Sequence, residues 1–197
     1  MNKNRRIALL LAVLFCLSAV TFVAVAKYIK DIPFTGNVTF KADLAETFTL
    51  TESEAEPNTD GTYSLNTSKS VESNTYILMP GVDVPKDPKI TIEGKTAVPA
   101  YLYVEVLESK NFPDEVTYTM AEGWLPLEGV PNVYYYETPI TGTPAALTIS
   151  ILKNNTLTVS DQLPRGSTGT LSFHAYMAQQ GKDQDAKTAF TTNFPTP

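Results

Sequence analysis

Short segments that alternate apolar and polar residues constrain the fold of this chain more than any other feature. From Lys27 onward, runs of about five to nine residues rich in Val, Ile, Thr, Tyr and Phe are separated by clusters of Gly, Pro, Asn and Asp. A period of two is typical of β-strands with one buried face. The 14 prolines are spread along the chain and leave little room for helices. The sequence therefore predicts an antiparallel, all-β domain.

The individual runs suggest a two-sheet sandwich of Greek-key or jelly-roll type. One short helix is expected, at Asp183–Phe190, and no repeat of fixed period is present. We expect strands near Asn37–Ala42, Thr47–Thr51, Thr62–Asn66, Asn74–Met79, Lys89–Glu93, Ala100–Glu108, Val116–Met120, Trp124–Leu127, Val133–Glu137, Leu147–Lys153, Thr156–Ser160 and Gly169–Ala178.

A rigid corner is expected in the middle of the chain, where Met79-Pro80-Gly81 ends one expected strand. Pro85 and Pro88 follow; they lack N–H groups and fix φ, so this connection cannot extend a ladder. The strand after the corner alternates cleanly, and one of its faces is expected to point into the core: Ala100, Leu102, Val104 and Val106.

Two pairs of residues predict tight turns. Asn154-Asn155 lies between two alternating runs and tolerates positive φ, so we expect a hairpin there. Asp60-Gly61 gives the same indication after an acidic segment. The carboxylates of Glu52–Asp60 are interpreted as a solvated loop, because they supply only part of a calcium-loop pattern.

The N-terminus has the layout of an export signal. Basic residues at positions 3, 5 and 6 precede an uncharged apolar run, Ile7–Ala26. Ala24 and Ala26 occupy the −3 and −1 positions of an A-x-A site, which predicts cleavage before Lys27. The run is also long enough to span a bilayer, so a retained membrane anchor is the alternative.

Cleavage before Lys27 would leave a single β-sandwich domain, residues 27–197, with no cysteine, because Cys16 is the only one in the chain. That domain would be held together by its core alone. It would carry 12 basic and 21 acidic residues, a net charge of −9. Nucleic acid is therefore not expected as a partner.

Several segments together give the chain a family likeness. The signal-like N-terminus, the Met79-Pro80-Gly81 corner, and the segments "KDPKITIEG", "AYLYVEVLES" and "LSFHAYMAQQ" resemble the TasA/camelysin family of exported Gram-positive proteins. The resemblance implies a jelly-roll-like sandwich, processing by a SipW-type signal peptidase with transient membrane contact, and secretion to the cell surface. It also implies self-association into biofilm matrix fibres, with accessory matrix proteins as further partners.

Subunits of this family are understood to join by donor-strand exchange, and the sequence offers a strand for it. Tyr28, Ile32, Phe34 and Val38 share one parity, interrupted by Lys30 and Gly36. We expect this arm, residues 27–38, to complete a sheet of the next copy. Pro33 removes one ladder donor, unless it lies on a non-bonded side. The alternative is that the stripe is the first strand of its own sheet.

The family resemblance also suggests a surface metallopeptidase of the camelysin type, as an alternative function. A zinc peptidase of the H-E-x-x-H kind needs two histidines one helical turn apart, whereas this chain has only His174. No G-x-S-x-G segment accompanies that histidine. We expect a surface or sheet-packing histidine, no enzyme activity, and no metal or other cofactor.

The tyrosines suggest a carbohydrate-binding sandwich as a further alternative, since exposed aromatic rings stack on sugars. Strand alternation instead favours core or cross-strand packing for them. The residues concerned are Tyr63, Tyr76, Tyr101, Tyr103, Trp124, Tyr134, Tyr135 and Tyr136.

Overall fold

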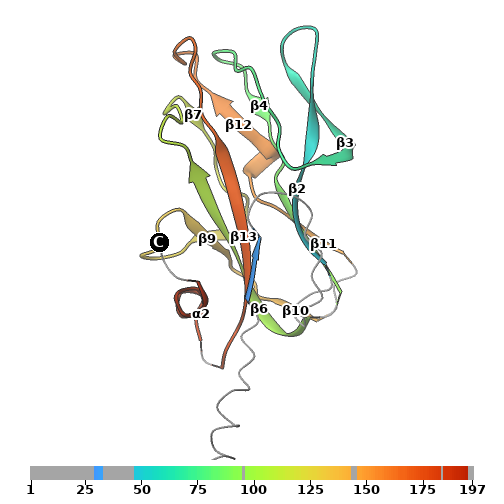
Figure 1. Ribbon diagram of the computed structural model, residues 1–197, viewed down its shortest axis with the longest axis vertical. Coiled ribbons are helices and arrows are strands. Elements are labelled where there is room, and N and C mark those ends of the chain that lie inside the picture. Colours follow the sequence, from blue (N-terminus) through green and yellow to red (C-terminus); the bar gives the residue numbers. More distant parts are fainter. Residues whose placement is uncertain (1–28, 33–46, 95, 143–145, 183, 195–197) are drawn as a thin grey trace, which may run out of the picture.

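A computed structural model describes residues 29–32, 47–94, 96–142, 146–182 and 184–194. Within these ranges the protein is mostly β-strand and has one short α-helix, α2 (Ala186–Asn193) (Figure 1). The strands are β1 (Ile29–Ile32), β2 (Thr47–Pro57), β3 (Tyr63–Val71), β4 (Val84–Pro85), β5 (Lys89–Glu93), β6 (Thr96–Glu108), β7 (Val116–Thr117), β8 (Trp124–Pro126), β9 (Val133–Tyr136), β10 (Ile140–Gly142), β11 (Leu147–Ser150), β12 (Thr156–Val159) and β13 (Leu171–Gln179).

The strands form three sheets, and every pairing among the described residues is antiparallel. The largest sheet has the order β1-β13-β6-β9-β8, with β10 also on β6. A four-stranded sheet runs β11-β5-β2-β3, and a small third sheet runs β4-β12-β7. The expectation of an antiparallel all-β domain is confirmed.

The two larger sheets share one apolar core, as in a sandwich. Alternate residues of each inner strand contribute to it, which follows from the two-residue period of the side chains. The buried residues from these inner strands are Phe48, Leu50, Ile90, Ile92, Ala100, Leu102, Val104, Val106, Phe173, Ala175 and Met177. The expected core face of β6 is therefore confirmed.

The opposite face of the six-stranded sheet carries a second core, which the sequence did not suggest. Helix α2 begins after Asp185, whose carboxylate accepts a hydrogen bond from the Thr188 backbone N–H. Its apolar residues pack on tyrosines of β6 and β13, and Tyr103 is fully buried. The cluster comprises Tyr101, Tyr103, Tyr176, Ala178, Leu127, Val130, Val133, Ala186, Ala189, Phe190 and Phe194.

The strand boundaries expected from the alternating pattern agree with the structure for some strands and differ for others. Lys89–Glu93 is a strand with those bounds, whereas the strand expected at Thr47–Thr51 continues to Pro57. Asn74–Met79 is not a strand, so that expectation is wrong. Its backbone is held by side chains instead: the Tyr63 hydroxyl accepts a hydrogen bond from the Ile77 N–H. The strand expected at Asn37–Ala42 lies outside the described residues.

The Pro-Gly corner has the geometry of a tight turn. The Val82 N–H donates to the Met79 carbonyl, and Gly81 has φ +74°, which favours glycine. Pro85 ends the two-residue strand β4, while the Pro88 carbonyl accepts a hydrogen bond from the Ile151 N–H. The prolines thus keep this connection from forming a long ladder.

The turn at Asn154-Asn155 does not close a hairpin, contrary to expectation. Both residues have the expected positive φ, 55° and 51°. However, β11 before the turn pairs with β5, whereas β12 after it pairs with β4 and β7. The turn therefore passes the chain from one sheet to another. Asp60-Gly61 does close a hairpin, between β2 and β3, and Gly61 has φ +85°.

Candidate assembly interface

Among the residues that the structure describes, strand β13 has a complete partner on one side only. Its nine residues pair with β6 from Leu171↔Glu108 to Gln179↔Ala100, with no shift in register. The hydrogen bonds continue beyond both ends of β13: the Ser109 N–H donates to the Thr170 carbonyl, and the Gln180 N–H donates to the Pro99 carbonyl. This side of β13 is therefore fully used.

The other side of β13 is covered along part of its length. Strand β1 pairs there with Ala175–Ala178, from Ile32↔Ala175 to Ile29↔Ala178 (Figure 1, β1 in blue beside β13). Among the described residues, no strand pairs with 171–174 on this side. Within the described ranges, β1 thus covers four of the nine residues of β13 on this side.

The edge lies directly beside the sandwich core. Phe173, Ala175 and Met177 alternate along β13 and are fully buried. On the opposite face, the Tyr176 hydroxyl donates a hydrogen bond to Glu105 Oε2, and His174 Nδ1 lies 3.7 Å from the same oxygen. A strand added at this edge would extend a sheet whose two faces are both packed.

The predicted donor arm meets this edge at the residues that can be placed. Ile32 is the last residue of β1 and pairs with Ala175. At these four residues the arm pairs within its own chain, as in the alternative of a first strand of the same sheet. The other donor residues (Tyr28, Phe34 and Val38) and the cleavage-site residues (Ala24, Ala26 and Lys27) lie outside the described residues.

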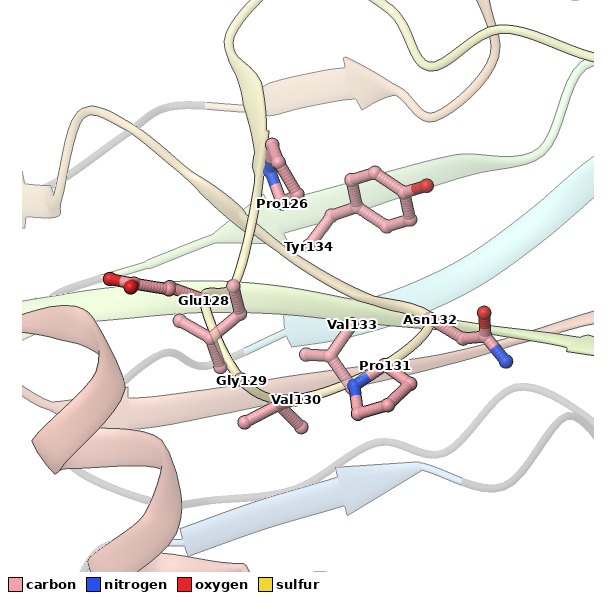
Figure 2. Close-up of a pocket in the computed structure, with 9 residues that line it drawn as sticks. Pro126, Glu128, Gly129, Val130, Pro131, Asn132, Val133 and Tyr134 are labelled. Atoms are coloured by element: carbon pink, nitrogen blue, oxygen red, sulfur yellow. The ribbon is translucent and has the colours of Figure 1, made fainter.

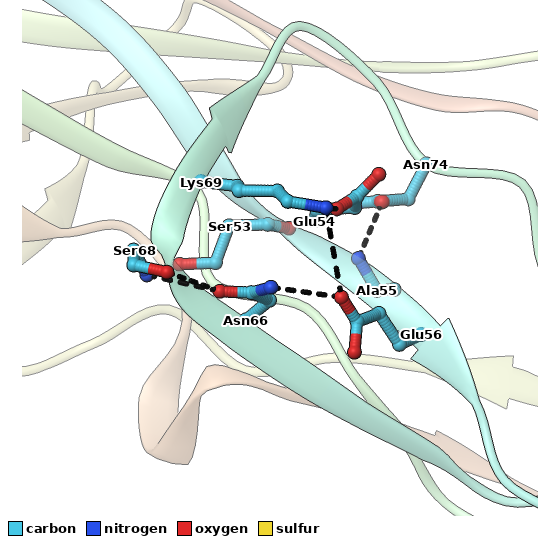
Figure 3. Close-up of polar contacts among 8 residues, drawn as sticks. All are labelled: Ser53, Glu54, Ala55, Glu56, Asn66, Ser68, Lys69 and Asn74. Atoms are coloured by element: carbon cyan, nitrogen blue, oxygen red, sulfur yellow. Dashed lines mark hydrogen bonds and ion pairs between the residues drawn. The ribbon is translucent and has the colours of Figure 1, made fainter.

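By contrast, the edge strand β3 carries protection against pairing. The β2–β3 register shifts between Ser53↔Ser70 and Glu54↔Asn66, so residues 67–69 form a bulge. Lys69 Nζ lies 2.8 Å from Glu54 Oε2 and 3.9 Å from Glu56 Oε1 (Figure 3). A bulge and a charged lysine are devices that discourage edge-to-edge association.

The remaining edges of the two larger sheets are short. Strand β8 has three residues and ends at Pro126, and β11 has four. The loop after β8 borders an open hollow of about 380 Å³ (Figure 2), lined by Pro126, Leu127, Glu128, Gly129, Val130, Pro131, Asn132, Val133 and Tyr134. Prolines and short strands make these edges poor templates for a long added strand.

The expectation of a solvated acidic loop at Glu52–Asp60 is wrong for its first residues, because Glu52 and Ser53 are buried in a polar cluster, whereas residues 56–60 are exposed. Glu52 belongs to β2 and is 1% exposed, and its Oε2 lies 2.8 Å from Lys86 Nζ. The side chain has the parity of Phe48 and Leu50, which turns it toward the core. That parity was the available signal, but the surrounding carboxylates concealed it.

The polar cluster also includes Ser53, Asp87 and Lys89, which are neighbours of Glu52 and Lys86 in the sequence. Asp87 accepts hydrogen bonds from the Ser53 backbone N–H at 2.7 Å and from the Ser53 hydroxyl at 2.6 Å. Lys89 Nζ donates to Asp87 Oδ2 at 3.1 Å. Burial raises the pKa of Asp87, but these hydrogen bonds outweigh burial and hold the pKa below its ordinary value. The cluster joins β2 to the segment before β5.

Residues considered for catalysis or sugar binding are mostly packed. Among the described residues, no group of three or more His, Cys, Asp or Glu is arranged to hold a metal ion. None of the helices in the described part is long and apolar enough to cross a membrane. Tyr101, Tyr103 and Trp124 are buried, and Trp124 packs edge-on against Tyr136 with ring centroids 5.4 Å apart. These aromatic rings build the cores.

Comparison of the chain with protein-family models, curated protein sequences and solved structures finds no match.

Proposed function

We propose that this protein is an exported structural subunit of extracellular matrix fibres. In this proposal, a SipW-type peptidase removes the leader before Lys27, and the freed arm of one copy completes the six-stranded sheet of the next. The folded unit is a jelly-roll-like sandwich, and its principal partner is another copy of itself.

The observation that carries the proposal is the edge of β13. This edge is nine residues long and regular, and it lies beside the core; in the part of the chain that the structure describes, its partner β1 covers Ala175–Ala178. Main-chain hydrogen bonds along such an edge give affinity to an added strand. The bulge and Lys69 on β3 also support β13 as the edge for assembly. They discourage association through β3, which would otherwise compete with association through β13.

Pairing of β1 with its own β13 is compatible with assembly. A terminal strand that can pair with its own sheet can exchange with the same strand of another copy, because both pairings form the same contacts. Because the same contacts are present in both states, the closed monomer and the exchanged fibre then differ little in free energy at this strand. Assembly gains from any additional pairing that the closed monomer does not make.

Electron microscopy of the protein secreted by a bacterial host tests the proposal. We expect regular filaments from the full-length gene product, and loss of filaments from a variant lacking residues 27–35. Ile32→Asp with Phe34→Asp is expected to abolish filaments while the domain stays folded, because it places charge on the apolar stripe. Thr35→Asp is the matched control on the opposite parity.

The proposal fails if the secreted wild-type chain stays monomeric, or if the variant lacking residues 27–35 forms filaments as well as the wild type does. A monomer that cleaves a protein substrate and loses this activity on chelation would instead favour the camelysin-type peptidase. Binding of a glycan by the monomer would favour the carbohydrate-binding alternative.

A further inference from the structure

One peptide bond of this chain differs chemically from all the others. Asp87 is followed by Pro88, and no other Asp-Pro pair occurs in the sequence. The nitrogen of Pro88 belongs to a tertiary amide, so it accepts a proton and leaves a carbonyl carbon more readily than an ordinary amide nitrogen does. The carboxyl group of Asp87 can attack its own main-chain carbonyl through a five-membered ring. The pair thus has the groups needed for intramolecular cleavage of the chain.

This bond lies in the buried segment between β4 and β5. Asp87 is 6% exposed, and Pro88 is buried as well. The main chain is held on both sides of the bond: the Lys86 N–H donates to the Asn155 carbonyl, and the Pro88 carbonyl accepts a hydrogen bond from the Ile151 N–H. Proteases prefer exposed loop tips. A cut at this bond must therefore come from the groups of the chain itself.

In the folded protein both carboxylate oxygens of Asp87 are held by hydrogen-bond donors. Oδ1 accepts from the Ser53 backbone N–H at 2.7 Å. Oδ2 accepts from the Ser53 hydroxyl at 2.6 Å and from the Lys89 ammonium at 3.1 Å. Cleavage needs a carboxyl oxygen that turns toward the Asp87 carbonyl carbon, and a proton that reaches the Pro88 nitrogen. Donors that hold the carboxylate in its ionised form oppose both requirements.

The other titratable groups near Asp87 leave this arrangement in place. Lys89 is the cation in direct contact with Asp87, and the Glu52 carboxylate is compensated by Lys86 at 2.8 Å. The Tyr76 hydroxyl stays protonated, because burial and then the charges of Glu52 and Asp87 raise its pKa. Burial raises the pKa of Asp87 too, but its hydrogen bonds outweigh burial and lower that pKa.

We propose that the Asp87–Pro88 bond is a self-cleavage site, which Ser53 and Lys89 block in the folded protein and which acid unfolding opens. A carboxyl oxygen of Asp87 bonds to the Asp87 carbonyl carbon, the bond from that carbon to the Pro88 nitrogen breaks, and the carboxyl proton moves to the nitrogen. Water then opens the cyclic anhydride. Asp87 becomes a new C-terminus and Pro88 a new N-terminus, so the net reaction is hydrolysis of the peptide bond and needs no oxidant or cofactor.

The strand pairing gives this cut a further consequence. The cut divides the chain between β4 and β5, but β2 pairs with β5 and β4 pairs with β12 across it. The fragments therefore stay together while the sheets are intact and separate when the protein unfolds. Refolding then requires separate fragments to meet in solution, so the cut makes acid unfolding irreversible. This inference does not depend on the proposed function, because it holds whether or not copies of the chain associate.

Mass spectrometry of the purified secreted protein tests the proposal. The protein is kept at about pH 4, near the ordinary pKa of aspartate, either in native buffer or in concentrated urea. The fragment that begins at Pro88 is measured over time, and fluorescence of Trp124 shows whether the protein is folded. In urea we expect this fragment from the wild type and none from Asp87→Asn, which lacks the carboxyl group. In native buffer the wild type should cleave at least about tenfold more slowly than in urea.

Ser53→Ala tests the blocking role of the hydrogen bonds. It removes the hydroxyl that donates to Asp87, so cleavage in native buffer should be about tenfold faster than in the wild type. In urea the two proteins should cleave at the same rate, because the hydrogen bonds are absent there. Ser70→Ala is the matched control, since Ser70 pairs with Ser53 in the β2–β3 ladder and is exposed. If Ser53→Ala does not fold at this pH, Lys89→Met takes its place.

Three results would overturn the inference. Absence of a fragment beginning at Pro88 in urea would show that the bond is not a cleavage site. Equal wild-type rates in urea and in native buffer would show that the fold does not block the reaction. Equal rates in native buffer for the wild type and the folded Ser53→Ala or Lys89→Met variant would remove the role of the hydrogen bonds. None of these results bears on filament formation, which tests the proposed function separately.

Discussion

Lys86 Nζ lies 2.8 Å from Glu52 Oε2 inside the sandwich, and the two side chains are 7% and 1% exposed. Glu52 Oε1 has no hydrogen-bond partner among the described residues, so the carboxylate depends on Lys86 for compensation of its buried charge. The pair joins β2 to the segment that precedes β5. The pair thus contributes to stability because each buried charge, the Glu52 carboxylate and the Lys86 ammonium, compensates the other.

Removing one partner of this pair is expected to be costly. Glu52→Gln leaves a buried ammonium without its counter-ion, and we expect a loss of about 3–5 kcal/mol in the free energy of unfolding. Glu52→Leu with Lys86→Met removes both charges, and its stability should return to within about 1 kcal/mol of wild type or above it. Urea unfolding followed by fluorescence of Trp124 measures both variants.

The control for the ion-pair prediction is Glu54→Gln, which disrupts the exposed pair with Lys69. It should change the stability far less than Glu52→Gln, because water screens that pair. A Glu52→Gln protein as stable as the Glu54→Gln protein would contradict the assignment of Glu52 to the core.

Asp87 is expected to make stability depend on pH in the acid range. Its pKa is lower in the folded protein than in the unfolded chain, so its contribution is present above the unfolded value of about 3.9. The contribution is lost as the pH falls through the folded pKa. Asp87→Asn should lower stability at pH 7 and flatten the decline between about pH 5 and pH 2.

Ser53→Ala tests how much the hydrogen bond from the Ser53 hydroxyl contributes to the lowered pKa of Asp87. This variant keeps the carboxyl but removes the hydroxyl that donates to it at 2.6 Å. Acid unfolding should then begin at a higher pH than in wild type, because the pKa of Asp87 rises. Denaturant midpoints measured across the pH series decide the matter; parallel curves for wild type and Ser53→Ala would contradict this role.

Much of the strand content could be predicted, because continuous ladders leave a period of two in the sequence. Lys89–Glu93 and the core face of β6 are examples. Strands β4 and β10 have two and three residues, too few for a period to be recognised. Asn74–Met79 alternates like a strand, but the Asn74 side chain and the Tyr63 hydroxyl satisfy backbone N–H groups nearby, so no ladder forms.

Of the candidate site, the sequence could predict the N-terminal arm but not the edge strand beside which it lies. The apolar parity of residues 28–38 is legible in the sequence, and Ile32 falls opposite the buried Ala175. The identity of the strand beside the arm, β13, follows from the order of strands in the sheet, which the sequence does not reveal. Contacts between residues so far apart in the chain leave no periodic signal, and neither does the covering of Tyr103 by α2.

Gly123 is expected to tolerate no side chain. It has φ +90°, and a Cβ atom there would lie 2.6 Å from the Tyr136 ring, which packs on Trp124. We expect Gly123→Ala to lose about 2–5 kcal/mol, from backbone strain and overpacking together. Gly142 has a similar φ, +81°, but no atom of the described residues lies within 4 Å of a Cβ atom placed there. Gly142→Ala should therefore lose only about 1–2 kcal/mol. Equal losses in the two variants would show that contact with Tyr136 contributes nothing.

Lys69 is expected to keep β3 from pairing with other copies. It lies on the bulged edge strand of the four-stranded sheet and is drawn back toward Glu54 and Glu56. Lys69→Val with Ser68→Val replaces this polar edge with β-branched residues, which should promote disordered aggregation through β3. Light scattering at increasing protein concentration measures the effect, with Lys153→Val as the control at an exposed turn. Because this edge belongs to the other sheet, aggregation should persist when residues 27–35 are deleted; aggregation that requires the arm would instead place it at β13.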